Sequence, residues 1–266
     1  MVMKAFELSQ NQDIVTALAI KGFSGDNIVP VLLELFPDGA ELGDALETIR
    51  YSNISNMFTV VFDGEMREVP DCKNLDITEV ISFPAGYMDG TAAFKGCKFL
   101  TKICNLPITL RKADRMFEGC VAFNQHVDIP EGVTSCDRMF YGCTNINREF
   151  TLPSTCVSAE GFLARCDRQE SAIFLNEGLQ NASYLLQGCY NYVHKFTIPS
   201  TVTDADYMME GCERFNQPMV VPDSVVRAEG MFRDCNSLEY VPELPAHLKE
   251  TKDILLGCPC DMYAFA

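Results

Sequence analysis

Thirteen cysteines and three histidines are the residues of this 266-residue chain whose types suit chemistry. Thiolates act as nucleophiles, redox centres and zinc ligands, and imidazoles act as bases or metal ligands. When cysteines recur at a constant interval, however, they indicate one supersecondary unit that is repeated and stacked, with the thiols in a buried column. Eight cysteines follow such a period, each 23 residues after the last: Cys97, Cys120, Cys143, Cys166, Cys189, Cys212, Cys235 and Cys258.

The other cysteines and the histidines do not form a catalytic or metal-binding set. We call the eight periodic cysteines the ladder cysteines and count positions from the preceding one. Cys104, Cys136 and Cys156 then fall at positions +7, +16 and +13, where the repeat turns side chains toward the core. His126 and His194 lie three repeats apart, about 14 Å at the spacing of β-strands, which is too far to share one metal ion. We therefore expect no catalytic residue, no cofactor and no metal site, and we do not expect an enzyme.

The C-terminal end is the one place where the sequence is compatible with accessible thiols. Cys258 and Cys260 flank a single proline, and exposed thiols, a metal ion or an intermolecular disulfide could occur there. Residues 259–266 are short cover for the last repeat, so either they fold over it or another subunit does. The second alternative implies a homo-oligomer or a larger assembly.

Further columns of residues repeat with the same period as the cysteines. Position +3 is usually large and apolar, +9 is always aliphatic, +16 is small, and +19 and +20 hold bulky pairs such as Met116-Phe117. Proline follows at +10 in six of seven repeats, and polar and apolar residues alternate before it, which predicts a short half-buried strand. Glycine commonly precedes the next cysteine, where we expect a tight helical turn with a positive φ.

The repeat I/L-P-x-x-V-x-x-A-x-x-M/F-F-x-G-C-x-x-L/F resembles the BspA-like leucine-rich repeats of bacterial surface proteins. At 116–125 and 209–217 its form is similar to repeats of mycoplasmal lipoproteins and phage proteins, with Phe-Asn-Gln after the cysteine. The resemblance covers residues 72–258 and implies a solenoid in which each repeat gives one strand of a parallel sheet. One repeat departs from the pattern, because Gln169 replaces the apolar +3 residue and Asn176 replaces the proline.

Residues 1–71 do not follow the period and are predicted to form a small helical cap. This segment either covers the exposed end of the first repeat or docks onto another protein. It carries 12 acidic and 4 basic residues, half of the net charge of −16, which fits a solvated face or a basic partner. The predicted elements are helices over 10–21, 27–36 and 41–51, a strand over 58–62 and a hairpin turn at 63–64.

Composition and charge exclude several classes of function. The chain is 47% hydrophobic and 22% charged, as in folded proteins, and its negative charge argues against nucleic-acid phosphate as a partner. Polar residues interrupt the first 21 positions, so no secretory signal is expected, and the apolar stretch 28–36 is too short to span a bilayer. We expect no membrane insertion and a location in the host cytoplasm or in a virion.

The outward face of the repeats is the remaining candidate for function. Positions +5, +6 and +8 are expected to point away from the core, and along the chain this face changes from polar to more apolar. Both a contact surface and an ordinary scatter of exposed apolar residues are compatible with this pattern. The candidate partner-binding residues are Arg148, Phe174, His194, Lys195, Pro218, Val220, Tyr240 and Val241.

These features predict an α/β repeat fold, a leucine-rich-repeat solenoid over 72–258 with an N-terminal helical cap and a short C-terminal cap at 259–266. The expected function is non-enzymatic binding of a protein partner. The resemblance implies attachment and display roles, and together with the missing secretion signal it favours a phage virion component, such as a capsid-decorating or tail-associated protein. The alternatives are an intracellular interaction adaptor and, more distantly, a thiol-based redox protein.

Overall fold

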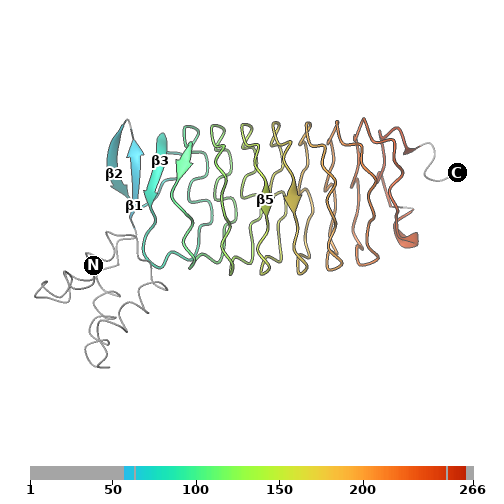
Figure 1. The fold of residues 1–266 in the computed structure, drawn as a ribbon, viewed down its shortest axis with the longest axis horizontal. Coiled ribbons are helices and arrows are strands. Elements are labelled where there is room, and N and C mark those ends of the chain that lie inside the picture. Colours follow the sequence, from blue (N-terminus) through green and yellow to red (C-terminus); the bar gives the residue numbers. More distant parts are fainter. Residues whose placement is uncertain (1–56, 63, 250, 262–266) are drawn as a thin grey trace, which may run out of the picture.

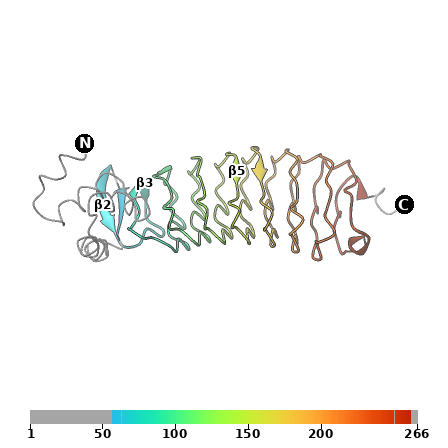
Figure 2. The same cartoon turned by 60° about the horizontal axis from the view of Figure 1, so that its bottom comes forward.

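The computed structural model describes residues 57–62, 64–249 and 251–261. After a small sheet at the N-terminal side, the chain winds as a row of coils that lie side by side along one axis (Figure 1). Figure 2 shows the same row after rotation, with β2 and β3 at one end and the last coils at the other. The elements are β1 (Phe58–Phe62), β2 (Glu65–Val69), β3 (Ile77–Ser82), β4 (Lys102–Ile103), β5 (Phe150–Thr151), β6 (Ile173–Phe174) and the 3-10 helix η2 (Ala246–Leu248).

Four strands form the N-terminal sheet, in the order β2-β1-β3-β4. β1 is antiparallel to β2 and β3, whereas β3 and β4 are parallel, so the sheet changes here from a hairpin to the parallel arrangement of the coils. The predicted strand over 58–62 is confirmed as β1, and Gly64 in the turn has φ +80°. Phe58 packs edge-on against Phe94, which ties the sheet to the core of the coils.

The helical cap predicted for residues 1–71 is not supported. The part of this segment that the structure describes is the β1–β2 hairpin, because the run Thr59-Val60-Val61 is β-branched and fits a strand. The predicted helices lie outside the described residues, at 10–21, 27–36 and 41–51.

Successive coils are joined by backbone hydrogen bonds along positions +15 to +22. Each coil is named here by the ladder cysteine that starts it. Parallel bridges connect position +15 of consecutive coils from Lys112 to Arg227. Alternate amides then bond to the next coil, as those of Arg115 and Phe117 do at 2.7 and 2.8 Å, while the Met116 amide bonds within its own coil. The segment thus satisfies its backbone groups without a helix or a long strand.

Two positions of this segment, +18 and +22, are left-handed in every coil from Cys97 to Cys235. At +22 the expected positive φ is confirmed, with +73° at Gly119 and +68° at Gly142. Position +18 holds Arg138 at +55° in the Cys120 coil. A right-handed helix cannot pass through such residues, so the predicted helical turn is wrong. The described repeats over 72–258 contain no α-helix, which corrects the expected α/β class.

Replacing Gly142 by alanine is expected to lower the free energy of unfolding by about 1 kcal/mol, through backbone strain alone. A Cβ at this residue would meet no atom within 4 Å, so no clash contributes. Urea denaturation of the two proteins measures the difference. An unchanged unfolding midpoint would contradict the left-handed geometry at position +22.

Equivalent side chains of neighbouring coils stack into one continuous core. Phe117 lies between Phe94 and Phe140, with ring centroids 5.5 and 5.4 Å apart and the rings nearly parallel. Phe150 lies 4.8 Å from Phe140 and extends the aromatic stack toward β5. Each coil buries its apolar face against its neighbours, so stability depends on the stack rather than on any single coil.

The strand predicted before each proline is only partly formed. β5 and β6 cover two residues each and pair in parallel, Phe150 with Ile173 and Thr151 with Phe174. The predicted alternation is confirmed, because Phe150 and Ile173 are buried while Thr151 and Phe174 are exposed. The main inter-coil bonding thus lies at +15 to +22, beside the small +16 residue, rather than at the predicted strand.

The irregular repeat keeps the stack intact. Gln169 is fully buried, and its amide donates to the carbonyls of Arg148 and Ser171 at 2.8 and 2.7 Å. Its side-chain oxygen accepts the Arg148 N–H at 3.3 Å. Asn176, in place of the proline, donates to the Cys156 carbonyl at 3.1 Å. A polar side chain fits this core because backbone groups satisfy it.

Candidate interaction surface

Each ladder thiol donates to a backbone carbonyl 25 or 26 residues earlier in the chain. Cys143 Sγ lies 3.1 Å from the Phe117 oxygen, and Cys166 Sγ lies 3.1 Å from the Phe140 oxygen. The other six make the same kind of contact at 2.8–3.3 Å. All eight are buried. The ladder cysteine therefore acts as a small apolar side chain with one weak donor, which fits a carbonyl that alanine would leave without this bond.

Burial also makes the ladder thiols from Cys97 to Cys212 chemically inert. It raises the pKa of Cys97 to about 11 and that of Cys189 to about 12. Burial raises the thiol pKa values of Cys120, Cys143 and Cys166 as well. The thiolate is the nucleophile and the metal ligand, so a thiol with a raised pKa has little reactivity at neutral pH.

The C-terminal cysteines are also buried, so the alternative of exposed thiols at this end is wrong. Cys258 is 5% exposed and donates to the Phe232 carbonyl, as its place in the ladder requires. Cys260 is fully buried, and burial raises its pKa to about 11. Its amide donates to the Leu238 carbonyl at 3.1 Å, so the chain folds back on the last repeat.

The histidines occupy separate environments. His126 Nε2 lies 3.0 Å from Asp128, and His247 Nε2 lies 2.8 Å from the Val225 carbonyl. His194 is exposed beside the ring of Tyr192. Across the described ranges, no group of three or more His, Cys, Asp or Glu side chains could hold a metal ion. Within the same residues, no helix has the length and apolar character to cross a membrane.

The structure places all eight candidate partner-binding residues at the surface, and we call this set the outer surface. Four of them are large, exposed apolar residues: Phe174, Val220, Tyr240 and Val241 are 49%, 55%, 52% and 42% exposed. They project outward because the neighbouring positions, such as Ile173 and Met219, turn into the core. The set comprises Arg148, Phe174, His194, Lys195, Pro218, Val220, Tyr240 and Val241.

The coil register decides which of these residues lie together. Pro218 and Val220 belong to the Cys212 coil, and Tyr240 and Val241 to the next one, so these four exposed apolar residues lie on two adjacent coils, and we call them the apolar group. Val220 pairs directly with position 243 of that next coil. The remaining residues belong to the three preceding coils. The outer surface therefore extends over five coils, about 20 Å at the spacing of parallel strands.

Basic groups flank the apolar group on one side. His194 and Lys195 are exposed on the coil next to Pro218 and Val220. Arg148, at the far end, is anchored because its Nε donates to the Asn124 carbonyl at 2.9 Å. The apolar end and the basic end together offer an amphipathic strip rather than a pocket.

A groove of about 740 Å³ on another side of the coils was not predicted from the sequence. Positions +22 and +1 line it, including Gly142, Gly188 and Tyr190, together with the acidic side chains of Glu210 and Glu213. Position +22 is mostly glycine because its backbone is left-handed, and the missing side chains leave this hollow. The glycine column is the sequence signal that could have revealed it.

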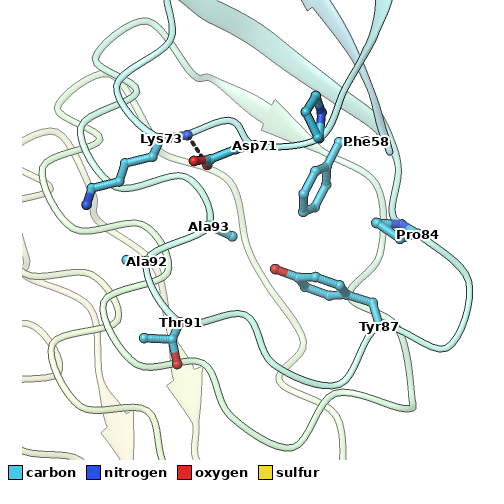
Figure 3. Close-up of a pocket in the computed structure, with 9 residues that line it drawn as sticks. Phe58, Asp71, Lys73, Pro84, Tyr87, Thr91, Ala92 and Ala93 are labelled. Carbon is cyan, nitrogen blue, oxygen red and sulfur yellow. Dashed lines mark hydrogen bonds between the residues drawn. The ribbon is translucent and has the colours of Figure 1, made fainter. Parts of the chain in front are cut away.

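A smaller pocket of about 380 Å³ lies at the N-terminal end of the described coils (Figure 3). Phe58 from β1 and Tyr87 line it, with ring centroids 5.3 Å apart. Asp71 accepts the Lys73 N–H at 2.9 Å, and burial raises the pKa of Tyr87, which keeps its phenol protonated. The pocket therefore offers apolar and hydrogen-bonding contacts rather than acid–base chemistry.

Comparison with known proteins matches two families along the coils. Residues 73–175 match the BspA type leucine rich repeat region in six copies. Residues 179–242 match a family described as Mycoplasma protein of unknown function, DUF285. No curated protein matches the sequence.

Two solved structures are similar to this chain. A leucine-rich repeat protein from Bacteroides ovatus is 18% identical over 70% of this chain and 62% of its own, with a TM-score of 0.44. The T. pallidum leucine rich repeat protein is 24% identical over 54% of this chain and 73% of its own, with a TM-score of 0.42. The chain thus spans less than two thirds of the Bacteroides protein.

The family match and the register of the coils support a leucine-rich repeat fold. The match to the BspA type over 73–175 confirms the resemblance carried by the Gly-Cys motif. The likeness to mycoplasmal repeats is confirmed for residues 209–217, because 179–242 match the Mycoplasma family. Residues 116–125 lie outside that match.

Proposed function

We propose that this chain is a non-enzymatic scaffold, a leucine-rich-repeat solenoid that binds a protein partner on its outer surface. The observation that carries the proposal is the exposed apolar group formed by Pro218, Val220, Tyr240 and Val241 on two adjacent coils. Exposed aromatic and aliphatic side chains that lie together have the composition of the centre of a protein–protein interface. Leucine-rich repeat families generally serve as binding scaffolds, which supports the same class of function.

The architecture suits a preformed binding surface. Hydrogen bonds between coils hold each backbone segment, and the aromatic stack around Phe140 fills the interior. A partner that binds such a surface loses little free energy to ordering of the scaffold. The shape of the outer surface favours a protein over a small ligand, because it is an extended strip and not a cavity.

The setting that we propose is a phage particle, where the scaffold decorates the capsid or is associated with the tail. The support is the likeness of residues 116–125 and 209–217 to repeats of phage proteins. The alternative setting is an intracellular adaptor with one soluble partner. Copurification with particles would support the first setting, and a stable complex with a single soluble protein would support the second.

Replacing Tyr240 by alanine is expected to weaken partner binding by about 2 kcal/mol, or roughly 30-fold, because buried aromatic anchors carry much of the binding energy of an interface. The partner would first be identified by crosslinking mass spectrometry, and its affinity would then be measured by titration calorimetry. Val226→Ala is the matched control, because Val226 is 63% exposed but lies at position +14, away from the outer surface. Equal losses in both variants, or none in either, would contradict the proposed surface.

A further inference from the structure

Two cysteines outside the ladder meet across a coil boundary. Cys136 Sγ and Cys156 Sγ are 3.3 Å apart, on the Cys120 and Cys143 coils, and both residues are fully buried. The two sulfurs also share one acceptor, the Ser158 carbonyl, at 3.7 and 3.3 Å. The ladder thiols differ from this pair, because each of them has a backbone carbonyl of its own about one repeat earlier in the chain.

Both residues are exceptions within their own columns. Every other described coil places a branched aliphatic residue at +13 and a small residue at +16, so burial alone explains neither cysteine. Position +13 holds Leu110, Val133, Cys156, Leu179, Val202, Val225 and Leu248. Position +16 holds Ala113, Cys136, Ala159, Ala182, Ala205, Ala228 and Thr251. Each column contains a single cysteine, and these two cysteines are the ones in contact.

We propose that Cys136 and Cys156 form a redox modification site, at which an intramolecular disulfide links the Cys120 coil to the Cys143 coil. The oxidant is a low-molecular-weight disulfide. One Sγ–Sγ bond forms in the protein and one disulfide bond breaks in the oxidant. The two thiol protons and two electrons end on the two small thiols that are released. The sulfurs must approach from 3.3 Å to about 2.05 Å, which needs only a small movement.

Burial decides when this bond forms. Exchange requires a thiolate, and the hydrogen bond to Cys156 together with burial holds the pKa of Cys136 well above its usual value. An oxidant reaches the pair only while the two coils are apart, during folding or transient opening. Once the coils close, the bond is shielded from reductants in the same way.

The linkage would staple two neighbouring coils. It joins residues 20 positions apart, so it restricts the unfolded chain and holds the boundary between the coils in register. Oxidation is therefore expected to raise the urea midpoint of unfolding. Arg148 of the outer surface lies on the Cys143 coil, so the linkage fixes the position of that coil relative to its neighbour.

Refolding of the reduced, unfolded full chain in a mixture of oxidised and reduced glutathione tests this site. After refolding, we expect denatured samples to titrate with two fewer free thiols than the thirteen cysteines of the chain. A non-reducing tryptic map should join peptide 116–138 to peptide 149–165, with fragmentation placing the bond at Cys136 and Cys156. The folded, reduced protein in the same buffer should acquire the bond more slowly.

Two variants carry the residues that the other coils have at these positions, which favours normal folding. Cys136→Ala and Cys156→Val should each keep twelve free thiols and lose the rise of the urea midpoint on oxidation. Cys104→Val is the matched control and should form the bond as the wild-type protein does. Thirteen free thiols after refolding would overturn the proposal, and so would a bond between ladder cysteines such as Cys235 and Cys258.

Discussion

Alkaline solution is expected to unfold this protein cooperatively between about pH 9 and 10.5. Burial raises the pKa values of six consecutive ladder thiols, from Cys97 to Cys212, above the ordinary 9.0. The unfolded chain loses these protons first, so their stabilisation is complete below pH 9 and is lost as the pH rises toward the folded values. Above pH 9, each thiol lowers the free energy of unfolding by about 1.4 kcal/mol per pH unit. For six thiols, the loss of unfolding free energy is about 8 kcal/mol at pH 10, which is comparable with the whole stability of a typical domain.

Circular dichroism as a function of pH, with a reductant present, measures this transition. Cys120→Ala combined with Cys189→Ala removes two of the six thiols, so the loss of stability per pH unit should be smaller than in the wild-type protein. Retention of the native signal through pH 11 would show that the ladder thiols are not buried as the structure has them. Return to neutral pH should restore the fold, which separates ionisation from chemical damage.

Phe140→Ala is expected to lower the free energy of unfolding by about 3–5 kcal/mol, because it removes a large side chain from a core that cannot collapse around the gap. Phe140 is fully buried and lies 5.4 Å from Phe117, 4.8 Å from Phe150 and 5.4 Å from Phe162. The cavity would therefore open in the aromatic stack that joins three coils. Urea denaturation followed by circular dichroism gives the change in free energy.

A second phenylalanine in the same protein supplies the control. Phe99 is 57% exposed, so Phe99→Ala should change the free energy of unfolding by less than about 0.5 kcal/mol. Similar losses for Phe99 and Phe140 would contradict the assignment of inside and outside positions that follows from the 23-residue period.

The period of the cysteines made the interior of the coils predictable. Once Cys143 is set at position zero, Leu152 at +9 and Ala159 at +16 are placed in the core, and both are buried. The outward set was predictable in the same way, because Phe174 and Val220 lie one position beyond buried residues. Periodicity fixes burial well since every repeat must bury the same face on its neighbours.

The backbone path was harder to predict. Arg138 and Tyr207 adopt a left-handed conformation at +18 although neither residue type favours it, because the hydrogen bonds between coils impose it. The predicted helical turn failed for this reason. Gly230 holds position +18 in the coil after that of Tyr207. A Cβ at Gly230 would lie 2.5 Å from the Tyr207 ring, so the Tyr207 side chain occupies the space that this glycine leaves free.

Contacts made by residues that depart from the repeat could not be predicted from the repeat pattern either. Gln169 looked like a fault in the repeat, but the backbone of the preceding coil satisfies its amide. Cys136 and Cys156 looked like two separate small apolar residues, and only the structure shows their sulfurs in contact. Such pairs depend on the three-dimensional register between coils and not on the order of residues within one coil.

Site-specific photocrosslinking tests the central claim, that a protein partner binds the outer surface, most directly. A photoreactive residue would replace Tyr240 in one protein and Val226 in another, since both positions are exposed but only Tyr240 belongs to the outer surface. Illumination in the native host extract should yield one protein adduct of defined mass at position 240 and none at position 226. Adducts only at position 226, equal adducts at both positions, or none at position 240 would contradict binding at this surface.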